Sequence, residues 1–180
     1  ANNMDLNRNH LILSEPETQA LHRFFEKYMF EVNMDVHEYS PLGDEWIKYG
    51  YRKNTAVALG GPTNINISSG IRDFANQKAL PYMMQYLNSS NFSSFVYCPG
   101  GPPELDYIRH STFDINDGRQ SFGILNSLCF IQEGMNGDDM YIDNIKFRAE
   151  SQCKGMRGLL EFVFLNKEEI KLAVHKAREQ

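Results

Sequence analysis

Apolar and polar positions recur along this chain with two different periods, which predict helices and strands in alternation. Between positions 21 and 29, apolar side chains follow the i, i+3, i+4, i+7, i+8 spacing of an amphipathic helix. In 32–37, apolar and polar residues alternate, which predicts a strand with Asp35 and His37 on one face. The mostly apolar run 127–133 turns polar at its carboxyl end, which favours a buried central strand. The remaining expected elements are strands within 51–59 and 92–98 and helices at about 69–87 and 143–177.

Two helices carry further detail. The segment SEPE at 14–17 reads as a capping box, with Ser14 as N-cap and Glu17 at N3 of the first helix. The expected packing face of the last helix is Leu159, Leu160, Val163, Ile170 and Val174. Helices that alternate with buried strands indicate a layered α/β fold.

Composition narrows the class of protein. The 180 residues are 42% hydrophobic and 23% charged, which suits a single globular domain over 1–180. The net charge of −5, without a basic run, argues against a nucleic-acid surface, and no apolar run approaches the ~20 residues of a membrane span. Cys98, Cys129 and Cys153 form no C-x-x-C pair, so neither a disulfide framework nor a cysteine-rich zinc site is indicated. The chain opens without an initiator Met or a signal peptide, and we expect a cut inside a longer protein.

Candidate chemistry lies at strand ends and near the amino terminus. His37 and Glu133 each stand at the carboxyl end of a predicted strand, where open α/β sheets bind ligands. Arg8, between Asn7 and Asn9, offers a planar fork suited to a carboxylate. Each residue alone also fits an ordinary solvated or structural role.

In combination, four segments resemble the zinc metallocarboxypeptidases of the carboxypeptidase A-like family. They are DLNRN at 5–9, SEPE at 14–17 opening a helix, DVHEYS at 35–40, and FIQEG at 130–134. The resemblance is specific over about 4–40 and loose over 120–135. It implies a three-layer α/β/α domain with a mixed sheet, of which this chain is the incomplete, carboxyl-terminal portion.

The resemblance also implies a role for each candidate. Asn7 and Arg8 correspond to the pair that binds the substrate's terminal carboxylate, and His37 to the last of three protein ligands on a catalytic zinc. Glu133 corresponds to the general base that activates the zinc-bound water. The substrate would be the C-terminus of a peptide or protein. Asp35 is a hypothetical partner that orients the His37 imidazole, although a solvated Asp fits as well.

The sequence departs from the family pattern first in its zinc ligands. The family's His-x-x-Glu segment, which supplies the other two zinc ligands, does not occur in the chain. We therefore expect these ligands in a missing amino-terminal half, and we expect this polypeptide alone to be inactive and to bind zinc poorly. The alternatives are a related zinc amidohydrolase that deacylates N-acyl amino acids and a non-catalytic carboxylate-binding module. A secreted or periplasmic location follows from family habit only.

Specificity residues are less defined. Tyr107 is the candidate for the family's mobile substrate-covering tyrosine, with Phe113 and Phe122 competing for that place. Arg119 fits either a pocket wall or a turn. Asp114 and Asp117 suggest a pocket for basic side chains.

Overall fold

The computed structural model describes residues 3–109, 111, 113–137 and 144–179. In chain order the elements are η1 (Leu6–Arg8), α1 (Pro16–Tyr28), β1 (Val32–Tyr39), α2 (Asp44–Lys48), β2 (Val57–Gly60), α3 (Ser69–Phe74), the π-helical segment η2 (Ala75–Ala79), α4 (Leu80–Ser89), β3 (Ser94–Val96), α5 (Gly118–Gly123), β4 (Leu128–Met135) and α6 (Ile145–Arg178).

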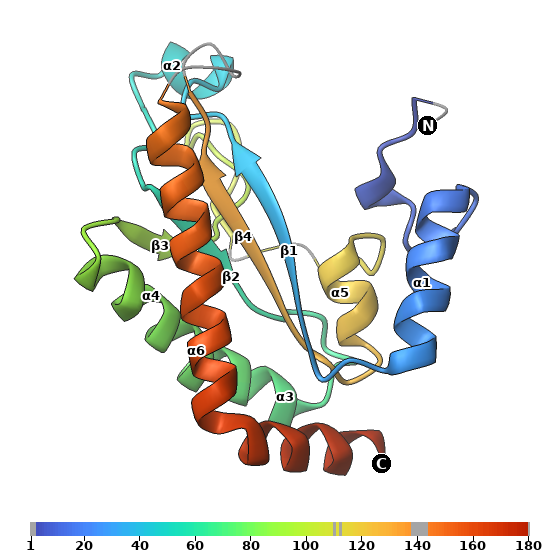
Figure 1. The fold of residues 1–180 in the computed structure, drawn as a ribbon. Helices are drawn as coiled ribbons and strands as arrows, with labels where there is room; N and C mark the ends of the chain where they lie inside the picture. The colour runs from blue at the N-terminus through green and yellow to red at the C-terminus, as the bar shows by residue number, and fades with distance from the viewer. Residues whose placement is uncertain (1–2, 110, 112, 138–143, 180) are drawn as a thin grey trace.

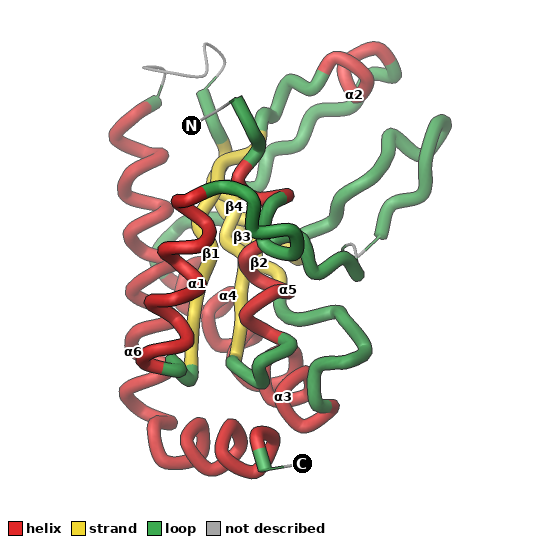
Figure 2. Tube along the Cα trace, turned by 90° about the vertical axis from the view of Figure 1, so that its right-hand side faces the viewer, coloured by secondary structure: helices red, strands yellow, loops and turns green. Residues whose placement is uncertain are grey.

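A mixed sheet forms the middle layer. Its strand order in the described chain is β1-β4-β2-β3, with β1 parallel to β4, β2 antiparallel to β4, and β3 parallel to β2. Helices α1 and α5 lie on one side of β1 and β4, and α6 crosses the other side together with α3 and α4 (Figure 1). In the turned view, α1 and α5 lie in front of the strands and α6 runs along the left (Figure 2). The expected three-layer α/β/α fold with a mixed sheet is confirmed.

The main core lies between the sheet and α3, α4 and α6. Leu59, Leu128 and Phe130 of the strands are fully buried against Met83 and Leu87 of α4. Burial of such side chains stabilises the fold by about 1.5–3 kcal/mol each. Successive residues of a strand point to opposite faces of the sheet. The strand residues next in sequence to these core residues therefore point to the other face, where the polar candidate site residues lie.

The start of α1 differs from the expected capping box. Its N-cap is Glu15, without a side-chain cap, and Pro16 occupies the first turn. A residue before proline is pushed into extended backbone, which places the boundary at Glu15 (φ −93°, ψ 138°) and makes the Ser14 assignment wrong. Asn9 Oδ1 instead accepts from the Glu15 amide (3.1 Å) and the Thr18 hydroxyl (2.7 Å).

Two predicted apolar faces are covered only in part. On α1, Phe25 is buried, whereas Leu21, Phe24, Tyr28 and Met29 remain 36–54% exposed, because β1 is the sheet edge and no described element covers their side. On α6, Leu160 is 67% exposed and its assignment to the packing face is wrong, since it lies about 100° around the helix from buried Leu159. Among the described residues, no helix has the length and apolar character to cross a bilayer.

Candidate functional site

Two of the candidate residues face each other across neighbouring strands. His37 of β1 and Glu133 of β4 are direct register partners, and Ala58 of β2 is the next residue in the same row. Residues in one row of a sheet project to the same face, so the imidazole and the carboxyl share the face that carries α1 and α5. Because β1 and β4 are parallel, this row lies near the carboxyl ends of both strands.

Asp35 holds the His37 ring. Its Oδ1 lies 2.8 Å from His37 Nε2, and the two side chains are about one-third exposed. The Asp35 hydrogen bond is the main cause that raises the pKa of His37, and burial opposes it. A carboxylate only accepts hydrogen bonds, so Nε2 carries the proton and Nδ1 keeps its lone pair when the ring is neutral. The predicted contact between Asp35 and the imidazole is present.

The turn η1 brings Asn7 to the same ring. Asp5 caps this turn by accepting the Asn7 amide hydrogen at 2.9 Å. Asn7 Nδ2 lies 3.0 Å from His37 Nε2, and because Nε2 carries the proton that Asp35 accepts, this is a close contact between two donors and not a hydrogen bond. Asn7 Oδ1 accepts from the Gly118 amide at 2.8 Å. The next residue, Arg8, is exposed and donates from Nη1 to the Asn7 carbonyl at 2.7 Å. A guanidinium therefore stands one residue from the side chain that contacts the imidazole.

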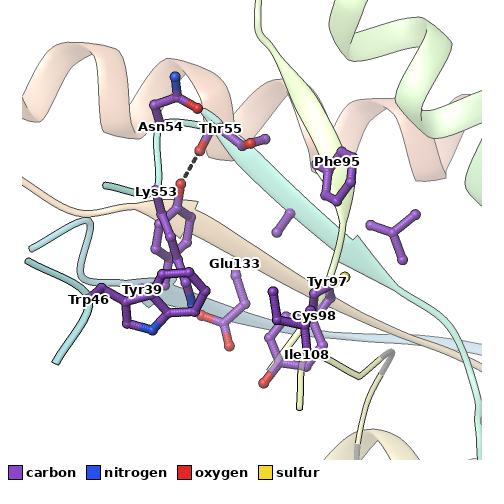
Figure 3. A pocket seen from close by; sticks show the side chains of 12 residues that line it. Tyr39, Trp46, Lys53, Asn54, Thr55, Phe95, Tyr97, Cys98, Ile108 and Glu133 are labelled. Atoms are coloured by element: carbon purple, nitrogen blue, oxygen red, sulfur yellow. Dashed lines mark hydrogen bonds between the residues drawn. The ribbon is translucent and has the colours of Figure 1, made fainter. Parts of the chain in front are cut away.

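The Glu133 carboxyl is 9% exposed and lines a cavity of about 230 Å³. Burial is the main cause that raises its pKa, and the positive charges of His37, Lys53 and Arg119 oppose the shift. Within the described chain no hydrogen bond or ion pair engages this carboxyl, and its oxygens point into the cavity (Figure 3). Such a group is a stronger base than an exposed Glu.

Four aromatic side chains, those of Tyr39, Trp46, Phe95 and Tyr97, line the cavity. The Tyr39 hydroxyl donates to the Thr55 carbonyl, and burial raises the pKa of this phenol to about 12. The full lining is Tyr39, Trp46, Lys53, Asn54, Thr55, Ala58, Phe95, Val96, Tyr97, Cys98, Ile108 and Glu133. The sequence did not single out Tyr97 or Trp46. Tyr97 directly follows β3, and its place at a strand's carboxyl end is the signal that could have found it.

Arg119 is fully buried under this region, on α5. It donates to the Ser111 hydroxyl and to the Gly61 carbonyl (3.4 Å), and its guanidinium lies 5.6 Å from the Tyr97 ring centroid. Asp117 caps α5 by accepting from the Gln120 amide at 2.7 Å and lies 3.4 Å from Arg119 Nη2. Neither Asp117 nor Asp114 is among the residues that line the cavity, so the idea of a pocket for basic side chains gains no support from them.

Tyr107 lies on a loop with 88% of its surface exposed and is not among the cavity residues, although the next residue, Ile108, is. Its role as a mobile tyrosine stays a prediction. Phe113 is 66% exposed, and Phe122 is buried against α1, stacked on Phe25 at 4.3 Å between ring centroids.

The donors that could hold a metal ion are few. His37 has one free ring nitrogen, but the described residues contain no group of three or more His, Cys, Asp or Glu side chains that could hold a metal. Catalytic zinc sites use three protein ligands. The described donors therefore do not make a complete metal site.

The chain resembles known proteins in fold but not in sequence. Neither the protein-family models nor the curated proteins contain a match to this sequence. Among solved structures, the fold is similar to a metallo-carboxypeptidase from Pseudomonas aeruginosa in complex with (2-guanidinoethylmercapto)succinic acid. The TM-score is 0.56 at 14% sequence identity, and the match covers 93% of this chain but 40% of that one. The chain thus has the fold of part of a carboxypeptidase-like domain.

Proposed function

We propose that this chain is the carboxyl-terminal portion of a metal-dependent carboxypeptidase-like domain, a hydrolase that removes the last residue of a peptide or protein. The main support for this proposal is that His37 and Glu133 lie side by side in one row of the sheet, with Asn7 in contact with the same imidazole. The fold likeness to a metallo-carboxypeptidase supports the coarse assignment to hydrolases.

Glu133 has the properties of a general base in this proposal. Its carboxyl is buried, without a described hydrogen-bond partner, and burial raises its pKa. It would take a proton from the attacking water and return it to the leaving amine. His37 would supply one metal ligand through Nδ1, with Nε2 held by Asp35, and two further ligands would come from outside this chain.

Arg8 and Asn7 would bind the substrate's terminal carboxylate. A guanidinium offers paired N–H donors that match the two oxygens of a carboxylate. Arg8 directly follows Asn7 in η1, and its charge acts on Tyr97 in the wall of the cavity, which supports this role. A substrate held there would present its last peptide bond toward Glu133.

Binding to the isolated chain tests the carboxylate role. Trp46 is the single tryptophan and lines the cavity, so its fluorescence reports on ligands there. We expect N-acetyl-phenylalanine to bind roughly two- to fivefold more tightly than its amide, the magnitude of an exposed charged pair. Arg8→Gln should abolish this preference, whereas Arg23→Gln, an exposed arginine on α1, should keep it. Equal binding of acid and amide by the unsubstituted chain would refute the carboxylate site.

Zinc binding tests the second part of the proposal. After dialysis against zinc, the isolated chain should retain little metal and should not hydrolyse a peptide with a free C-terminus. One tightly held zinc per chain would show that the ligand set lies within this polypeptide.

A further inference from the structure

The cavity beside Glu133 has the composition of a cation-binding cage. Tyr39 and Trp46 stand on one side and Tyr97 on the other, with the buried carboxyl between them (Figure 3). Aromatic faces attract ammonium and guanidinium groups, and a carboxylate adds a full opposite charge. A site of this kind would be expected to take a basic side chain.

A cation of the chain itself already lies there. The Lys53 ammonium lies 4.7 Å from the centroid of the Trp46 ring and 5.9 Å from that of Tyr39. The side chain is half-buried and runs along the Tyr39 ring toward Trp46 (Figure 3). Its charge acts on both Glu133 and Cys98, which places it within electrostatic reach of the cavity floor.

We propose that Lys53 determines specificity by occupying the cation position of this cage, so that the remaining cavity accepts aromatic or apolar substrate side chains and rejects basic ones. The inference rests on the proposed function, which identifies the ligand as a terminal carboxylic acid. A substrate ammonium or guanidinium would have to share one carboxylate with Lys53, and like charges brought together in a partly desolvated site repel strongly. An aromatic ring meets no such repulsion and gains contact with the Trp46, Phe95 and Tyr97 side chains.

The charges that face the cavity support this assignment. The groups that act on Glu133 are His37, Lys53 and Arg119 as positive charges and Asp35 as a negative one. Arg119 is fully buried, whereas Lys53 is among the lining residues. Lys53 is therefore the cation that a ligand in the cavity would contact.

Ligand pairs that differ in side-chain charge test the proposal. Trp46 fluorescence of the full 180-residue chain is titrated with N-acetyl-phenylalanine and N-acetyl-arginine, each as the free acid and as the amide. The unsubstituted chain should bind the phenylalanine acid roughly ten- to a hundredfold more tightly than the arginine acid. Lys53→Met should bring the two acids to within a few-fold of each other, mainly by tighter binding of the arginine acid. Lys53→Arg should keep the original preference, because it keeps the charge.

Lys48→Met is the matched control, because Lys48 is exposed on α2, lies against the Tyr49 ring and is not among the cavity residues. It should leave the ratio of the two acids unchanged. An unchanged ratio in Lys53→Met, or a ratio in Lys53→Arg that matches Lys53→Met, would overturn the role of Lys53. If acids and amides bind equally to the unsubstituted chain, the proposed function fails. If acids are preferred but the phenylalanine acid is not, only the specificity proposal fails.

Discussion

Phe122 of α5 packs against α1, and these two helices cover the face of the sheet that carries His37 and Glu133. Its removal tests how this helix layer is held together. The ring is 6% exposed and stacks on Phe25 of α1 at 4.3 Å with an interplanar angle of 16°. It also lies edge-on to His10, 5.7 Å between centroids. Phe122→Ala therefore removes a stacked aromatic contact between α5 and α1, the helix that follows the segment carrying Asn7 and Arg8.

The expected loss follows from burial and stacking. A buried Phe→Ala change costs about 3–5 kcal/mol. A neighbouring cavity of about 210 Å³, lined by Phe25 and Phe122, already leaves space beside the ring, which favours the lower end of that range. Phe122→Leu keeps most of the volume and loses the stacking, worth about 0.5–1.5 kcal/mol. We expect about 3 kcal/mol for Phe122→Ala and about 1 kcal/mol for Phe122→Leu.

Urea unfolding followed by circular dichroism measures both losses, with Phe164→Ala as the control. Phe164 is 71% exposed on α6, and its removal should change the free energy of unfolding by less than about 0.5 kcal/mol. The reasoning is refuted if Phe122→Ala costs no more than Phe164→Ala, or if Phe122→Leu costs as much as Phe122→Ala.

Three further outcomes are expected. Burial raises the pKa of Glu133, so its carboxyl stays protonated to higher pH in the native protein than in the unfolded chain, and stability falls as the pH rises above the ordinary Glu pKa of 4.5. Urea midpoints should therefore show Glu133→Gln to be more stable than the unsubstituted protein at about pH 7 but not at about pH 3. Gly155→Ala should destabilise by about 1–3 kcal/mol in the same assay, because the new Cβ would lie 2.0 Å from the side-chain oxygen of fully buried Gln132; a midpoint shift near zero would show that this side chain moves freely. Burial lowers the pKa of both His10 and His22, so the unfolded chain takes up protons first and stability should fall as the pH drops below about 6.5. The double His→Gln variant should lose this dependence of stability on pH, and an equal dependence in both proteins would contradict the role of the two histidines.

The strands were predictable because their local patterns are strong. The alternation around Asp35 and the apolar run before Glu133 each identify a strand of eight residues, β1 and β4. Their pairing was not predictable from pattern, since His37 and Glu133 are far apart in sequence and meet only through the register of two parallel strands. The family resemblance was what suggested that they act together.

Other elements left no readable pattern. All six residues of α5 are buried, so this helix has no polar face and no apolar period to detect. The opposite case is α1, where the spacing of Phe24 and Tyr28 defines an apolar face. Both rings are exposed, because only the tertiary arrangement decides whether another element packs on such a face. Lys53 and Trp46 came together through loop geometry, which a linear pattern does not encode.

The edge position of β1 has a consequence for how long the site persists. In the described sheet, β1 is bonded along one side to β4, and a strand held on one side opens more easily than a central one. Each such opening would carry the imidazole of His37 away from Glu133. Deuterium uptake at the β1 amides that face β4 would therefore report how readily these two groups separate.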